Sequence, residues 1–179
     1  MARRSVLRGL RLSVIAWLAV TTSCGADEVL SPADFEGQYP LVQVNGRGRD
    51  WFHQVSQECQ AAFRTGSLII TTSSTRRVKQ FRFRVDYDYR CLGTHPVDGS
   101  ATLDVTGTEV KSTEAMLVLN GYGPDMVSGL GADRWSLEAR PVGANLEVRI
   151  WGLNGQLWGE PVFLMGPKQT YDGPCFVGC

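Results

Sequence analysis

The feature that most constrains the fold of this chain is a run over residues 80–91 in which apolar and polar side chains alternate. Its apolar members are Phe81, Phe83, Val85, Tyr87, Tyr89 and Cys91, and its charged members are Arg82, Arg84, Asp86, Asp88 and Arg90. Side chains on a β-strand point to opposite faces in turn, so this segment has one face for a core and one for water. The run predicts a long strand whose buried face is largely aromatic.

The partner of this strand is expected in the preceding segment, which contains Leu68 to Ile70 and is joined to it through a Ser/Thr-rich stretch over 73–77. A hairpin centred on Thr75 pairs Ile69 with Phe81, Thr65 with Val85, Phe63 with Tyr87, and Cys59 with Cys91. Nothing in the apolar pattern requires the two cysteines to meet, so their coincidence favours both the hairpin and a Cys59–Cys91 disulfide. Closing a loop of this size contributes about 3–4 kcal/mol in the chain-entropy picture.

The segment just before this hairpin allows two interpretations. Six of its residues also fit one face of a helix opened by Asp50 as N-cap: Trp51, Phe52, Val55, Cys59, Ala62 and Phe63. We expect a loop or short helix up to about Gln57, followed by strand.

A second strand-rich region runs over residues 133–165 and carries two turn signals. Asn154-Gly155 suits a two-residue type I′ turn and sets Trp151 opposite Trp158 and Arg149 opposite Glu160. A turn at Gly143-Ala144 sets Arg140 opposite Glu147 and Glu138 opposite Arg149. The other face carries Trp135, Leu137, Ala139, Val148, Ile150 and Phe163. These pairs predict a meander with a charged outer face and an apolar inner face.

The remaining strands are predicted from shorter runs of alternating apolar residues. One is expected over 38–45, closed by Asn45-Gly46, and two more over 101–105 and 110–119, before a glycine-rich loop over 121–131. The sum is about eight antiparallel strands in roughly 130 residues, with sequence neighbours adjacent in space. We therefore predict an all-β fold, a single up-and-down barrel over 37–166, because closure removes exposed sheet edges. A two-layer sandwich is the alternative.

The first 23 residues predict a secretory signal peptide. Four arginines precede an apolar run that is shorter than the roughly 20 residues a spanning helix needs, and small residues then lead into Cys24. This ending resembles the bacterial lipobox, which implies a lipid-anchored mature protein that begins at Cys24. Cleavage after Ala26, leaving a soluble secreted protein, is the alternative. Residues 24–36 are expected to form a polar tether.

The net charge limits the kinds of partner that we expect, and the cysteine content limits the possible disulfides. Without the signal segment the chain keeps 14 basic and 18 acidic residues, a net charge of −4, which argues against nucleic acid as a partner. Outside the cytoplasm disulfides persist, and after lipidation four cysteines remain: Cys59, Cys91, Cys175 and Cys179. A small Cys175–Cys179 loop in a C-terminal tail over 167–179 is the preferred second bridge, although four cysteines allow three connectivities.

Two stretches carry a resemblance to a known family. The opening Gly37-x-Tyr39-x-Leu41-x-x-Val44-Asn45-Gly46 resembles the first strand of small bacterial lipocalin-like lipoproteins. The later order of Cys59, Gly66-Ser67-Leu68, a hairpin and Tyr89-Arg90-Cys91 is similar to theirs as well. The resemblance covers about residues 37–165 and implies a compact barrel tethered to the cell envelope. It implies no catalytic residues.

Candidate chemistry is sparse. His53 and His95 stand in no metal or triad pattern, so we expect no metal site. Asp86 and Asp88 share a strand face with three arginines, which favours a solvated charged surface over a calcium site. The glycine-rich loop lacks the residues of a phosphate loop. Trp151 and Trp158 are expected either to stabilise their hairpin or to form a contact patch for a partner or glycan.

These observations predict a non-catalytic binding module without a cofactor, held at the membrane by its lipid anchor. Its ligand is expected to be a small apolar molecule or an envelope partner, since barrels of eight strands are about wide enough to hold one small ligand or to fill with side chains. The candidate ligand-lining residues are Phe81, Phe83, Tyr87, Tyr89 and Trp135. A structural envelope protein with a filled barrel is the first alternative. A hydrolase is the second, although nothing resembles an activated nucleophile or an acid–base pair.

Overall fold

Ten antiparallel strands and one short 3-10 helix make up the computed structural model of this chain. It describes residues 30–55, 57–72, 78–113, 115–124, 132–152, 161–174 and 176. The elements are η1 (Pro32–Phe35), β1 (Gly37–Val44), β2 (Arg47–Gly48), β3 (Phe52–Gln54), β4 (Cys59–Thr72), β5 (Lys79–Cys91), β6 (Val97–Ser112), β7 (Leu117–Pro124), β8 (Ala132–Val142), β9 (Asn145–Gly152) and β10 (Val162–Met165). Within the described ranges, no helix is long and apolar enough to cross a membrane.

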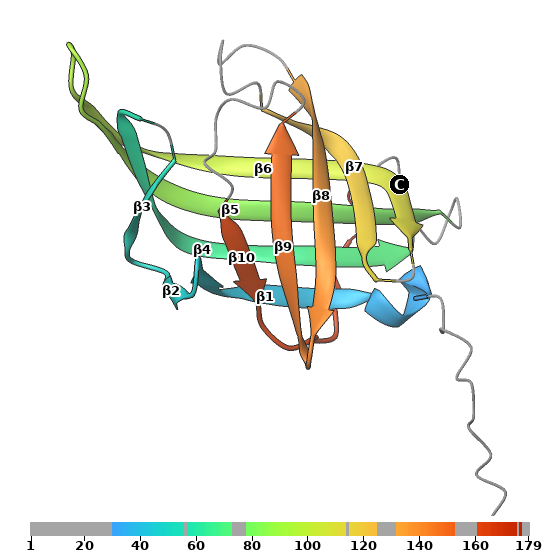
Figure 1. Cartoon of the computed structure of the whole chain (residues 1–179). Coiled ribbons are helices and arrows are strands. Elements are labelled where there is room, and N and C mark those ends of the chain that lie inside the picture. Colours follow the sequence, from blue (N-terminus) through green and yellow to red (C-terminus); the bar gives the residue numbers. More distant parts are fainter. Residues whose placement is uncertain are drawn as a thin grey trace, which may run out of the picture.

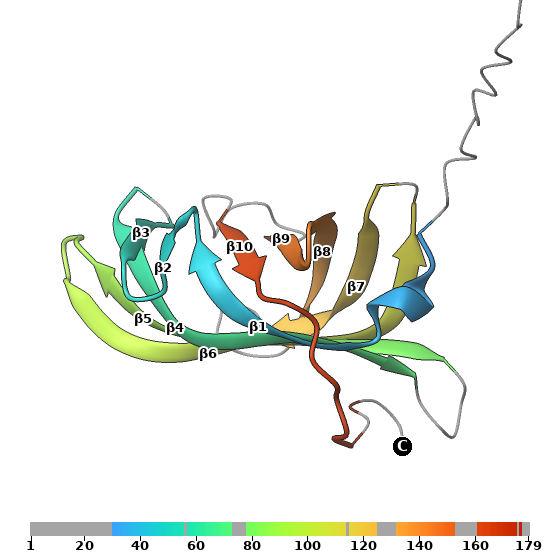
Figure 2. The same cartoon turned by 90° about the horizontal axis from the view of Figure 1, so that it is seen from below.

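The strands close into a barrel because β1 has a partner on each side. It pairs with β10 through residues 41–44 and with β4 through residues 37–40. The wall therefore has eight strands, β1 and β4 to β10, each antiparallel to its neighbours, while β2 and β3 are additions at one end (Figures 1 and 2). This confirms the predicted all-β up-and-down barrel over the sandwich, and the closed fold is compatible with a lipocalin-like one.

The β4–β5 hairpin follows the predicted register only over its first part. Cys59 lies opposite Cys91 and Phe63 opposite Tyr87, as predicted. A β-bulge between Phe63 and Thr65 then shifts the pairing by one residue. The predicted pairs Ile69–Phe81 and Thr65–Val85 are therefore wrong: Ile70 lies opposite Phe81, and Thr65 lies opposite Asp86. The bulge inserts one unpaired residue, which a pattern read from one strand does not reveal.

In the β8–β9–β10 meander, the predicted pairs between β8 and β9 are confirmed, and the predicted pair between β9 and the next strand is wrong. Arg140 pairs with Glu147 and Glu138 with Arg149, across a two-residue turn with Gly143 at φ 62°. The predicted Arg149–Glu160 pair is wrong, because Arg149 lies opposite Val162. Closure of the barrel fixes β10: the Val162 N–H donates to Asn45 Oδ1, and the Asn45 N–H donates to the Val162 carbonyl, both at 2.8 Å. The predicted turn at Asn154-Gly155 lies outside the described residues, as does Trp158.

Two further predictions about local structure need correction. The segment after Trp51 forms the short strand β3, which pairs with β4 through Phe52–Ala62 and Gln54–Gln60, instead of the expected loop or short helix. The glycine-rich segment is not all loop either, because β7 continues through Gly121 to Pro124. The predicted turn at Asn45-Gly46 is confirmed by its two positive φ angles, 50° and 72°.

The two ends of the barrel are built differently. At one end η1 folds across the opening, where Phe35 is buried and its carbonyl accepts a hydrogen bond from the Tyr39 hydroxyl at 3.2 Å. The tail after β10 returns along β1 and bonds to it through Gln38 and Gln169. The opposite end carries β2, β3 and the ends of β5 and β6 (Figure 1). We call this second end, with the side chains Trp51, Phe52, Leu92 and Val97, the rim.

Candidate functional site

The five residues predicted to line a ligand site all lie on the inner side of the wall. Phe81 and Phe83 are fully buried, Trp135 and Tyr87 nearly so, and Tyr89 is half-buried at the rim end of β5. Burial raises the pKa of Tyr87 to about 12, with a smaller contribution from the neighbouring Tyr89. The phenol of Tyr87 is therefore neutral at physiological pH. The prediction placed these side chains on the correct face.

The aromatic rings of the interior contact one another. The Phe163 ring of β10 meets Phe63 of β4 edge-on at 5.0 Å between centroids and Phe83 of β5 at 5.3 Å. Tyr87 in turn lies 5.9 Å from Phe63. Such contacts join strands from different sides of the barrel and add to the stabilisation that burial of the rings provides. Three cavities lie elsewhere along the described residues, and none of these three is lined by the five predicted residues.

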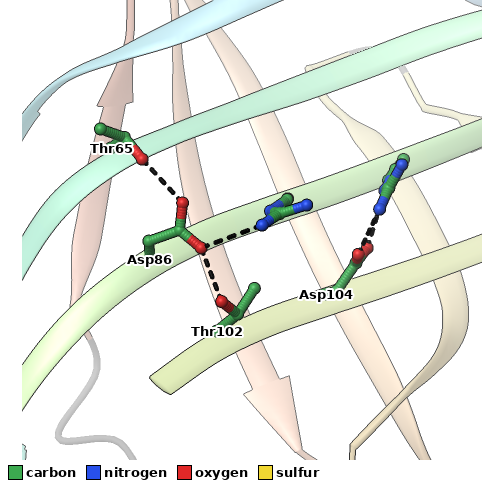
Figure 3. A network of polar contacts seen from close by, with 6 residues as sticks. Thr65, Asp86, Thr102 and Asp104 are labelled. Atoms are coloured by element: carbon green, nitrogen blue, oxygen red, sulfur yellow. Dashed lines mark hydrogen bonds and ion pairs between the residues drawn. The ribbon is translucent and has the colours of Figure 1, made fainter. Parts of the chain in front are cut away.

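The outer face of β4, β5 and β6 carries a network of carboxylates and their donors (Figure 3). Asp86 accepts hydrogen bonds from the Thr102 hydroxyl at 2.6 Å and the Thr65 hydroxyl at 2.8 Å, which reach it from the two neighbouring strands. Arg84 forms an ion pair with the same carboxylate at 3.4 Å. The hydrogen bond from Thr102 is the largest cause that lowers the pKa of Asp86, so the group stays ionised.

Asp88 likewise accepts hydrogen bonds from the Ser100 hydroxyl at 2.7 Å and from Arg64 Nε at 2.7 Å. The hydrogen bond from Ser100, followed by that from Arg64, lowers its pKa below the ordinary value. Further along, Arg82 Nε donates to Asp104 at 2.9 Å. These ladders tie three strands together, although water screens the exposed ion pairs and leaves each of them weak. The described residues contain no group of three or more potential ligands that could hold a metal ion.

The rim gathers exposed apolar side chains at the end opposite η1. Trp51 is 58% exposed, Phe52 37%, Leu92 65% and Val97 49%. Two arginines hold the aromatic pair: Arg47 Cζ lies 5.2 Å from the Trp51 ring centroid, and Arg90 Cζ lies 5.0 Å from that of Phe52. A cation over an aromatic face is attracted to the ring, by about 0.5–1 kcal/mol at exposed sites, while much of the ring stays in water. Each aromatic residue of the rim thus has a neighbouring arginine.

The two histidines have different surroundings. His95 is exposed in the connection between β5 and β6. His53 on β3 points into the barrel, is 7% exposed and lies 6.2 Å from the Phe63 ring. Burial, and then the charge of Arg47, lowers its pKa, so the imidazole is neutral at pH 7. Within the described part of the chain, its Nε2 has no hydrogen-bond partner.

A separate hollow lies on the outer wall where β6 bends. A β-bulge between Thr106 and Glu109 sets two residues of β6 against one of β7. The resulting outer pocket, about 300 Å³, is walled by Thr106, Thr108, Glu109, Asn120, Tyr122 and Arg134 over a floor of Gly107 and Gly121. Tyr122 is 63% exposed beside it. Lys111 and Arg134 both form ion pairs with Glu109, and the hydrogen bond from Lys111 is the largest cause that lowers the pKa of Glu109.

Of the predicted cysteine chemistry, the structure describes one bridge. Cys59 and Cys91 are bonded at the rim end of β4 and β5, as the register of the hairpin predicted. Cys24, Cys175 and Cys179 lie outside the described residues. Trp151 is half-buried on the outer face, opposite Ser136.

Comparisons of the chain with protein-family models, with curated proteins and with solved structures find no match.

Neither the rim nor the outer pocket was predicted from the sequence. The stretch around Trp51 was expected to be a loop or short helix, whereas Phe52 begins β3 and lies next to the inward-facing His53, so its side chain points outward. Tyr122 was assigned to a loop. Its position between Gly121 and Gly123 is the signal that was available, because glycines on the inner face of a strand mark a close approach of backbones.

Proposed function

We propose that this protein is a non-catalytic, extracytoplasmic binding module that meets an envelope protein at its rim. The observation that carries this proposal is the contrast in burial among aromatic side chains. Phe63, Phe83 and Phe163 are fully buried and pack on one another inside the barrel, while Trp51 and Phe52 are exposed at one end. Exposed apolar side chains that are held in place are typical of contact sites, and tryptophan and arginine are enriched where binding energy concentrates.

The orientation of the barrel supports the same role. If Cys24 carries a lipid, the short segment up to Leu30 spans at most roughly 20 Å, which keeps the η1 end close to the membrane. The rim lies at the other end of the barrel (Figure 1). It would then face the envelope space, where a partner is accessible. A lipocalin-like lipoprotein of the bacterial envelope is the kind of protein that this arrangement and the sequence resemblance favour.

Site-specific photocrosslinking in the producing cell tests the proposal. A photoreactive residue is placed at Trp51 and, as the matched control, at Val142, which is 50% exposed at the η1 end. We expect one dominant adduct from position 51, absent from position 142 and reduced at least fivefold when Arg47 and Arg90 are both replaced by Ala. Equal adducts from the two positions, or none from position 51, would contradict a partner at the rim.

Two further measurements separate the alternatives. Native mass spectrometry of protein purified from its own host is expected to show the mass of the processed, lipidated chain with no further molecule bound, whereas a retained small apolar molecule would favour a ligand inside the barrel. Replacing Cys24 with Ala is expected to release the protein from the membrane fraction. A variant that remains membrane-bound would exclude the lipid anchor.

A further inference from the structure

The outer pocket has the construction of a ligand site. Its floor is rigid backbone, since the inner side of both glycines is occupied: a Cβ at Gly121 would lie 2.4 Å from the Thr106 carbonyl oxygen and 2.8 Å from Phe81 Cζ. No side chain rises from these two positions to fill the hollow. The volume of about 300 Å³ is at the lower end of the range for ligand pockets, about 300–1,000 Å³. It suits a single small ring.

The polar groups around the pocket determine which kind of ligand ring could bind there. Thr106, Thr108 and Asn120 offer neutral groups that can both donate and accept hydrogen bonds. Glu109, the carboxylate of the wall, already pairs with Arg134 Nη2 at 3.4 Å and with Lys111, and Asn120 bonds to it as well. A ligand need not supply a charge to this carboxylate, so the pocket suits a neutral ligand rich in hydroxyl groups.

Tyr122 completes the pocket with an aromatic surface. It lies opposite Thr106 on one side and Arg134 on the other, so its ring borders the polar wall. The face of an aromatic ring is electron-rich and attracts weakly positive C–H groups. A pyranose ring presents such C–H groups on its faces and hydroxyl groups around its edge. It can therefore stack on Tyr122 while its edge meets the wall.

We propose that the outer pocket binds a neutral sugar unit of a glycan, with Tyr122 as the stacking platform. A second aromatic extends the same surface, because Asn120, Ser136 and Trp151 lie in one row across β7, β8 and β9. This row places Trp151 where a neighbouring sugar unit would continue. Glu109 is the single carboxylate among the residues that line the pocket, whereas glycoside hydrolysis uses two. The site therefore binds a glycan without cleaving it.

This site is on a different face from the rim and does not depend on the proposed protein partner. Its test is a titration followed by saturation-transfer NMR, with glucose, N-acetylglucosamine, the β-1,4-linked N-acetylglucosamine trimer and glucuronic acid as probes. We expect at least one neutral probe to bind the intact protein with a Kd of millimolar or below. Failure of every probe to bind would overturn the proposal.

Variants separate a sugar site from a general loss of structure. Tyr122→Ala is expected to weaken binding at least tenfold, Tyr122→Trp to retain it, and Phe52→Ala at the rim to leave it unchanged. Equal binding by Tyr122→Ala and the unaltered protein would overturn the role of Tyr122. Tighter binding of glucuronic acid than of glucose would overturn the neutral class of ligand. Crosslinking at the rim is expected to be the same in Tyr122→Ala, so the two proposals fail separately.

Discussion

The inner and outer sides of the same barrel wall use aromatic residues in opposite ways. On the inside, Phe63, Phe83 and Phe163 are fully buried, and their rings meet edge to face. On the outside, Phe52 of β3 and Tyr122 of β7 are exposed, although both strands belong to the same sheet. Residue type alone does not separate the two groups. What separates them is strand parity, because neighbouring positions on a strand face opposite sides of the wall.

The difference teaches which aromatic residues maintain the fold and which are available for contacts. An interior ring gains from burial and from its ring neighbours, so its loss leaves a cavity. An exposed ring has gained little of that stabilisation, so its apolar surface remains available to be buried by a partner. Two further cavities among the described residues lack an exposed ring of this kind. The one beside Phe35 and Tyr39 is about 380 Å³ and the one beside Lys168 and Tyr171 is about 280 Å³, and neither has an exposed aromatic platform among its lining residues.

The strongest way to break the comparison is to remove an interior ring. Phe163→Ala is expected to lower the free energy of unfolding by about 3–5 kcal/mol, because Phe63 and Phe83 both lose the ring they pack against. Tyr122→Ala on the outer side is expected to change it by less than about 0.5 kcal/mol. Urea denaturation of both variants measures the difference. Similar losses in the two variants would show that the two sides are not energetically distinct.

The disulfide sits where the inner face of β4 and β5 reaches the rim. Replacing Cys59 and Cys91 together with Ala is expected to cost about 3–4 kcal/mol, because a loop closed over a sequence separation of 32 no longer constrains the unfolded chain. Denaturation with and without a reductant provides the measurement. Reductant is expected to destabilise the unaltered protein but not the double variant. A double variant as stable as the unaltered protein would contradict the stabilising role of the disulfide.

Glycine positions test how tightly the wall is built at the bulge. Gly121→Ala is expected to cost about 1–3 kcal/mol, since the new methyl group would meet the Thr106 carbonyl and the Phe81 ring. Gly48→Ala is the matched control, because a Cβ there has no atom within 4 Å and no positive φ is involved. Chemical denaturation of the pair is the measurement. Equal stability of the two variants would mean that β6 and β7 do not approach closely on the inner side.

The smallest expected effect concerns His53, a polar group on the inner side. Its pKa is lowered in the folded state by burial and by Arg47, so the unfolded chain takes up a proton first as the pH falls below about 6.5. The free energy of unfolding is therefore expected to decrease on acidification from pH 7 to 5.5, by at most about 1.4 kcal/mol per pH unit for one proton. His53→Leu is expected to reduce this slope, as urea midpoints across the range would show. An unchanged slope in His53→Leu would assign the acid sensitivity to other groups.

Several elements could be predicted from the sequence because their signals are local. The alternation over 80–91 identified β5 and its inner face, and Asn45-Gly46 and Gly143-Ala144 identified two turns. The failures share a different cause. The helix alternative for the Trp51 segment and the loop assignment of Tyr122 both treated a short apolar or glycine-rich stretch in isolation. In the structure, each stretch is a strand because a neighbouring strand supplies its hydrogen bonds.

The candidate sites were less predictable than the fold. The predicted inner face was correct, but whether it leaves room for a ligand depends on how side chains from several strands meet, as Phe163 does with Phe63 and Phe83. The outer pocket requires a bulge in β6, and the rim requires Arg47 and Arg90 to lie over particular rings. None of these arrangements leaves a periodic signal in the chain. They follow from contacts between residues distant in sequence.

By itself the sequence determined which segments extend, which face of each is apolar, and that Cys59 meets Cys91. Period-two patterns and turn residues act over a few positions, so they are legible in one strand or one hairpin. Only the tertiary structure decided the register of β10, which is set by Asn45 from 117 positions away, and the bulges at Arg64 and Gly107. A closed barrel must satisfy every strand pair at once. The final register is therefore a property of the whole ring of strands.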